Sequence, residues 1–181
     1  AGLTPEQRAN LVDALGAAIK DRTDEFASCA VKEIAAPYGF SKGQVAMARM
    51  TLKFYAQLAR DFEFEERRTG YFGEVLVRKE PVGVVAAIVP FNGPLFAAML
   101  KVAPALASGS TVVLKVPVET PLFSYVLAEC IQEAGIPAGV INILAADRDA
   151  SEHLVAHHDV AMASITGSVV AGRRVAEICG S

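Results

Sequence analysis

From residue 83 onward, short apolar segments alternate with helix-like segments, and this alternation constrains the fold more than any other feature of the sequence. The expected strands cover residues 83–89, 111–115, 140–144 and 160–165, and the expected helices cover 95–106, 121–134, 150–157 and 168–179. Strands that are apolar on both faces are typical of a parallel sheet covered by helices on both sides. The sequence therefore predicts an α/β fold with a doubly wound, Rossmann-like and mostly parallel sheet.

The first part of the chain has helical rather than strand periodicity. Thr4, Pro5 and Gln7 together resemble a capping box with proline at the first helical position, which predicts a helix start there. Two further helices are expected at 23–34 and 42–61. A helical segment therefore precedes the sheet.

A charged, turn-rich stretch at 61–73 separates the helical segment from an alternating strand at 74–80. We place the domain boundary there. Residues 1–73 are expected to form a helical segment that packs on the second domain. Residues 74–181 are expected to form the doubly wound α/β domain.

Charge and composition exclude several classes of protein. The net charge is −3, and the doublets Arg67–Arg68 and Arg173–Arg174 are isolated surface pairs rather than a basic patch for nucleic acid. No apolar run approaches the roughly 20 residues of a membrane helix, and residues 1–10 lack the apolar core of a signal peptide. The three cysteines are widely and irregularly spaced, which favours a reducing cytoplasm over a disulfide framework or a zinc site. We expect a cytoplasmic protein without nucleic-acid partner, membrane association or metal.

The expected strands end in polar or tight segments. In doubly wound sheets, ligands bind at the carboxyl ends of the strands. These ends are 90–92, 115–117, 145–147 and 166–168. The sequence pattern thus places a ligand site at these segments.

The same segments carry a family resemblance. Residues 80–85 read EPVGVV and residues 90–94 read PFNGP, and further blocks follow in the same order and spacing at 101–109, 112–115, 119–121, 134–142 and 165–172. Together they resemble the NAD(P)-dependent aldehyde dehydrogenase family over residues 80–181. The resemblance implies that residues 74–181 form an incomplete, Rossmann-like NAD(P)-binding domain. The resemblance implies oxidation of an aldehyde to a carboxylic acid by thiolate attack, hydride transfer to NAD or NADP, and thioester hydrolysis in the intact parent protein.

The resemblance assigns catalytic roles to two residues. Asn92 matches the side-chain amide of the family's oxyanion hole, although it could also serve only to fix the turn between Pro90 and Pro94. Lys101 matches a lysine that lines the catalytic cavity, and the alternative is a solvent-facing lysine on a helix surface. Phe96, Ala97 and Leu100 are expected to face the substrate tunnel, which favours an apolar or aromatic aldehyde.

The cofactor residues are also assigned by resemblance. Lys115 matches the lysine that bonds the adenosine ribose, and the alternative is a solvent-facing strand-end lysine. Val118 stands where many NAD-preferring relatives carry a glutamate that grips the ribose, so the choice between NAD and NADP is open. Phe91 stands where relatives often carry tryptophan beside the phosphates. The remaining expected contacts are Ile88, Val89, Pro90 and Ser151.

Gly167, Ser168 and Gly172 match the family's pyrophosphate site at the start of the last helix. Helix N-termini favour anions, and glycine permits close approach of the backbone. The alternative is that Thr166 to Ser168 form only a turn and an N-cap.

No cysteine matches the family's nucleophile, and its general-base glutamate would follow Ser181. We therefore expect the chain alone to be inactive. We expect a homodimeric or homotetrameric parent, and self-association of the chain through exposed apolar surface. Two alternatives remain: a naturally short, non-catalytic nucleotide-binding or interaction module, and part of an acylating dehydrogenase that uses coenzyme A.

Overall fold

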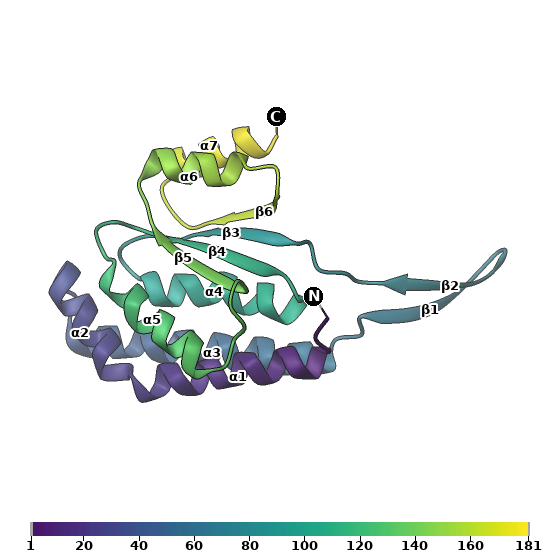
Figure 1. Cartoon of the computed structure of the whole chain (residues 1–181), viewed down its shortest axis with the longest axis horizontal. Helices are drawn as coiled ribbons and strands as arrows, with labels where there is room; N and C mark the ends of the chain where they lie inside the picture. The colour runs from purple at the N-terminus through teal and green to yellow at the C-terminus, as the bar shows by residue number, and fades with distance from the viewer. Residues whose placement is uncertain (1, 181) are drawn as a thin grey trace.

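The structure is a computed structural model that describes residues 2–180 (Figure 1). The helices are α1 (Pro5–Asp21), α2 (Thr23–Ile34), α3 (Tyr38–Asp61), α4 (Pro94–Ser108), α5 (Leu122–Glu133), α6 (Arg148–Ala156) and α7 (Val169–Cys179). The strands are β1 (Glu65–Gly70), β2 (Gly73–Arg78), β3 (Val84–Ile88), β4 (Thr111–Val116), β5 (Ile141–Ala145) and β6 (Val160–Ile165). None of the helices in this part of the chain combines the length and the apolar character that a membrane crossing requires.

Strands β3 to β6 form a parallel sheet in the order β5-β4-β3-β6. Helices α4 and α5 cover one face of this sheet, and α6 and α7 cover the other (Figure 1). Strands β4 and β5 follow β3 on one side of it, in chain order, whereas β6 pairs with the other side of β3. This reversal is the switch point at which doubly wound sheets bind ligands. The predicted fold class is confirmed.

Helix α4 lies between the sheet and the helical layer of α1 and α3 (Figure 1). It is apolar over most of its surface, as expected for a helix that is buried along most of its length. Its buried residues include Met99, Val102 and Ala103, each with no exposed surface. The burial fixes the position of α4, and therefore of the loop that precedes it.

The helical layer is connected to the sheet domain by packing and by ion pairs. The expected capping box at Thr4 and Gln7 is present, and the backbone amide of Gln7 donates a hydrogen bond to Thr4 Oγ1 at 3.2 Å. At the end of α1, Arg22 forms ion pairs with Glu129 and Glu133 of α5. The third helix starts four residues earlier than predicted, at Tyr38, directly after Pro37.

Strands β1 and β2 form an antiparallel hairpin that projects from the body of the molecule (Figure 1). Strand β2 was expected, but the interpretation of 61–73 as turns was wrong, because β1 occupies residues 65–70. Charged side chains are compatible with this strand since the ribbon is exposed on both faces, and Arg78 pairs with Glu65 at 2.7 Å across it. The boundary that we expected between residues 73 and 74 falls at the start of β2 and stays a prediction.

Candidate functional site

A cleft of about 470 Å3 opens at the carboxyl ends of the parallel strands. Ile88 of β3, Lys115 of β4 and Ile165 of β6 form its floor, and α6 and α7 form its walls. The remaining lining residues are Val118, Glu119, Ala146, Asp147, Arg148, Ser151, Glu152, Val170, Ala171, Arg174 and Val175. The position agrees with the ligand site expected from the strand ends.

The cleft brings together four of the expected cofactor residues: Ile88, Lys115, Val118 and Ser151. Burial lowers the pKa of Lys115 from its ordinary value, while the carboxylates of Glu119 and Asp147 act in the opposite direction. Lys115 is half-buried and lines the cleft, so the solvent-facing alternative does not describe it.

Gly167 and Ser168 lie between β6 and α7, and Gly172 lies near the start of α7; none of the three lines the cleft. Ser168 caps α7, since the Ala171 amide donates to Ser168 Oγ at 3.2 Å. A Cβ atom at Gly167 would make only ordinary contacts, and one at Gly172 would meet nothing within 4 Å. Packing within the described residues therefore does not require glycine at either position.

One wall of the cleft contains an ion pair that we did not predict. Arg174 of α7 contacts Glu152 of α6, with 2.7 Å between Nη2 and Oε2. We had interpreted Arg174 as part of an isolated surface doublet, but it lines the cleft. Its spacing of four residues from Val170 on α7 would have placed both on one helix face.

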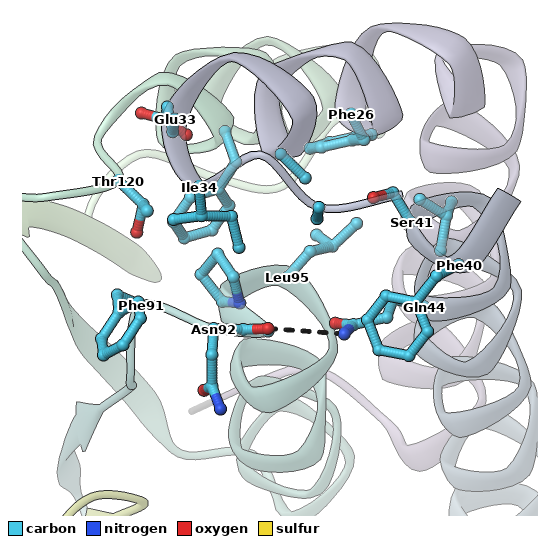
Figure 2. Close-up of a pocket in the computed structure, with 16 residues that line it drawn as sticks. Phe26, Glu33, Ile34, Phe40, Ser41, Gln44, Phe91, Asn92, Leu95 and Thr120 are labelled. Atoms are coloured by element: carbon cyan, nitrogen blue, oxygen red, sulfur yellow. Dashed lines mark hydrogen bonds between the residues drawn. The ribbon is translucent and has the colours of Figure 1, made fainter. Parts of the chain in front are cut away.

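Phe91 and Asn92 lie in the loop between β3 and α4 and line a second, smaller pocket between this loop, α2 and α3 (Figure 2). The backbone oxygen of Asn92 accepts a hydrogen bond from Gln44 Nε2 of α3 at 3.5 Å. The side-chain amide of Asn92 is exposed and points away from this pocket (Figure 2). Val89 is buried and Pro90 half-buried where β3 ends.

Lys101 is buried in α4, with 8% of its surface exposed, so the alternative of a solvent-facing lysine is wrong. Its Nζ atom donates to Thr166 Oγ1, just beyond β6, at 2.8 Å. Burial lowers its pKa from the ordinary value of lysine. Near it on α4, Leu100 is exposed, Phe96 is half-buried and Ala97 is buried. Their expected position along a substrate tunnel stays a prediction.

None of the three cysteines lines either pocket. Burial raises the pKa of the Cys29 thiol, and it raises that of the Cys130 thiol to about 11. A thiolate nucleophile needs a lowered pKa, so these two thiols are poorly suited to that role. Cys179 is exposed at the end of α7.

The sheet order and the position of the cleft define a doubly wound α/β domain with a cleft at the switch point of its sheet. Residues 1–181 match the model of the aldehyde dehydrogenase family. A geranial dehydrogenase of Castellaniella defragrans is 50% identical over 129 residues, which are 71% of this chain and 27% of that protein. The chain belongs to the aldehyde dehydrogenase family.

Solved structures agree with this assignment. An aldehyde dehydrogenase from Mycobacterium tuberculosis complexed with NAD+ has a TM-score of 0.93 and 35% identity, covering 98% of this chain and 37% of that one. An NADP-dependent enzyme of E. coli has a TM-score of 0.92 and 31% identity, covering 99% and 38%. The chain thus spans less than two fifths of the length of each of these relatives.

Proposed function

We propose that the cleft binds NAD or NADP and that the intact protein oxidises an aldehyde to a carboxylic acid. The observation that carries the proposal is the convergence of Ile88, Lys115, Val118 and Ser151 on one cleft at the strand ends. Family membership supports the reaction class. When bound, NAD(P) supplies the hydride acceptor for the oxidation.

The residues of the cleft fit a dinucleotide. The ammonium of Lys115 is partly desolvated, and it would donate hydrogen bonds to ribose hydroxyl oxygens. The glycines at 167 and 172 leave room for close approach to the start of α7, where backbone N–H groups favour phosphate. Ser168 would then both cap α7 and border the pyrophosphate. Residues 88–91 would contact the cofactor at the end of β3.

Asn92 and Lys101 are proposed as the catalytic residues of this chain. The exposed amide of Asn92 would donate a hydrogen bond to the aldehyde oxygen as negative charge develops there. The buried ammonium of Lys101 would line the same cavity from α4 while holding Thr166. Lys101 belongs to α4, and Asn92 lies in the loop directly before this helix. The buried position of α4 therefore restricts where both residues can lie.

The preference between NAD and NADP depends on position 118, where the apolar side chain of Val118 lines the cleft and is 53% exposed. A carboxylate there would accept bonds from both ribose hydroxyls and repel a 2′-phosphate. With valine in its place, we propose that the cleft accepts both cofactors.

The thiol chemistry is proposed to lie outside this chain, because Cys29 and Cys130 have raised pKa values and no cysteine lines either pocket. The chain alone would then be inactive. The exposed Leu100 and half-buried Phe96 favour an apolar or aromatic aldehyde. We further propose a cytoplasmic location and a homodimeric or homotetrameric parent protein.

A calorimetric titration of the chain with NAD+ and NADP+ tests the cleft. Replacement of Lys115 by methionine removes hydrogen bonds from a charged donor, and we expect it to weaken binding about 10- to 100-fold. Lys20→Met, on the exposed surface of α1, is the matched control and should bind as the wild type does. Equal affinities of the two variants, or no binding of either cofactor to the wild type, would refute the proposal.

A further inference from the structure

All three histidines of the chain lie at the end of α6 and in the turn before β6. They are His153 on α6, His157 at its C-cap and His158 in the turn, and Asp159 follows directly. The turn is at the amino end of β6, whereas the dinucleotide cleft is at the carboxyl ends of the strands. The cluster therefore takes no part in the function proposed above.

The spacing of the side chains is close to that of a metal site. One ligand atom from each of His157, His158 and Asp159 lies within 4.8 Å of the other two. The Asp159 carboxylate is 3.4 Å from His158 Nε2 and 3.9 Å from His157 Nδ1. A tetrahedral ion with bonds of about 2.0–2.2 Å holds its ligand atoms about 3.4 Å apart. The rings of His157 and His158 are stacked, with 4.6 Å between their centroids and 19° between their planes. Both side chains would therefore have to rotate for their nitrogen lone pairs to point at one ion, and their exposure on the surface leaves them free to do so.

His153, on α6, lies close to the three residues. It precedes His157 by one helical turn, a spacing that places both rings on the same side of α6. The two ring centroids are 6.2 Å apart. The four side chains are exposed, so an ion can reach them without disturbing the core. At His157 Nδ1, an ion would replace one hydrogen bond, donated by the Asp159 amide at 3.2 Å.

We propose that His157, His158 and Asp159, with His153 as a fourth ligand, form a surface site for a divalent transition-metal ion such as Zn2+. Imidazole nitrogen with one carboxylate oxygen favours zinc, nickel and copper, whereas magnesium and calcium prefer all-oxygen sites. The ion would join the end of α6 to the start of β6. From the spacing of the cysteines we expected no metal site, whereas the positions of the histidines favour one.

The test is a calorimetric titration of the full chain with zinc chloride and, separately, with magnesium chloride. It is done in the Cys179→Ser variant, because an exposed thiol can also bind zinc. We expect one zinc ion per chain and no magnesium binding. His157→Gln and His158→Gln should each weaken zinc binding at least about tenfold, since loss of an outer partner alone costs 10- to 100-fold. Asp149→Asn, an exposed carboxylate at the start of α6, is the control and should change nothing.

Two results would overturn the proposal. One is zinc binding that is absent, not saturable at one ion per chain, or unchanged in both histidine variants. The other is a thiolate-to-metal absorption band on binding Co2+, which would place the ion on a cysteine. Cofactor affinity measured with and without zinc separates this proposal from the previous one, because the two sites are at opposite ends of β6 and should bind independently.

Discussion

The two faces of the parallel sheet are packed differently. On one face, α4 is buried along most of its length and α5 contributes Phe123, Leu127 and Cys130 to the core. On the other face, α7 has no buried residue and α6 has only Val155. The packed face fixes Lys101 and the Asn92 loop, while the open face leaves room for the cleft. The side of the sheet covered by α4 and α5 is thus tightly packed, and the side covered by α6 and α7 is accessible to a ligand.

The largest expected effect compares core truncation on β4 with surface truncation on α7. Leu114→Ala removes a side chain with no exposed surface and should lower the free energy of unfolding by about 2–5 kcal/mol. Val170→Ala, at a side chain that is 71% exposed, should change it by less than about 0.5 kcal/mol. Urea denaturation of both variants checks this, and equal losses would contradict the difference between the faces.

A second prediction uses the Cys130 thiol on the packed face. Its pKa is about 11 in the folded chain against an ordinary value of 9.0, so between these pH values the folded state retains a proton that the unfolded state releases. Stability should therefore fall as the pH rises from about 9 to 11, by up to about 3 kcal/mol.

Cys130→Ala removes this contribution. Lys101 and Lys115, whose pKa values are lowered by burial, act in the opposite direction, but they are present in both proteins. The difference between wild type and variant in urea denaturation at several pH values therefore isolates the thiol. A difference that does not vary with pH would show that the thiol is not desolvated on folding.

The smallest effect is expected on the open face. Arg174→Gln removes the ion pair with Glu152 between α6 and α7, and solvent screening of these side chains should keep its contribution to stability small. Thermal unfolding of the variant measures this directly. A loss as large as that of Leu114→Ala would mean that the α6–α7 contact is a major part of the folding energy.

Most of the fold could be predicted from the sequence because β3 to β6 are continuous apolar segments separated by helices with clear periodicity. Strand β1 could not, since Glu65, Glu66, Arg67 and Arg68 show no alternation. The structure forms that strand by pairing it with β2 in a hairpin, and the residue pattern of β1 alone does not contain this contact.

The candidate site was predicted in part. The strand-end rule pointed to the edge of the sheet where the cleft opens and where Lys115 lies, while the role of Lys115 stays a prediction. Arg174 was overlooked, since its position in the cleft depends on how α7 packs beside α6. The burial of Lys101 was left open because α4 is apolar over most of its surface, and its sequence therefore does not show which face is outermost.

The contact between Gln44 and Gly93 has a consequence for how this protein can vary. A Cβ atom at position 93 would lie 2.7 Å from Gln44 Oε1, at the free end of a flexible side chain. An alanine there would displace the amide and its bond to the Asn92 backbone without disturbing the core. Positions 44 and 93, although distant in the sequence, should therefore be exchanged as a pair in any redesign of the loop.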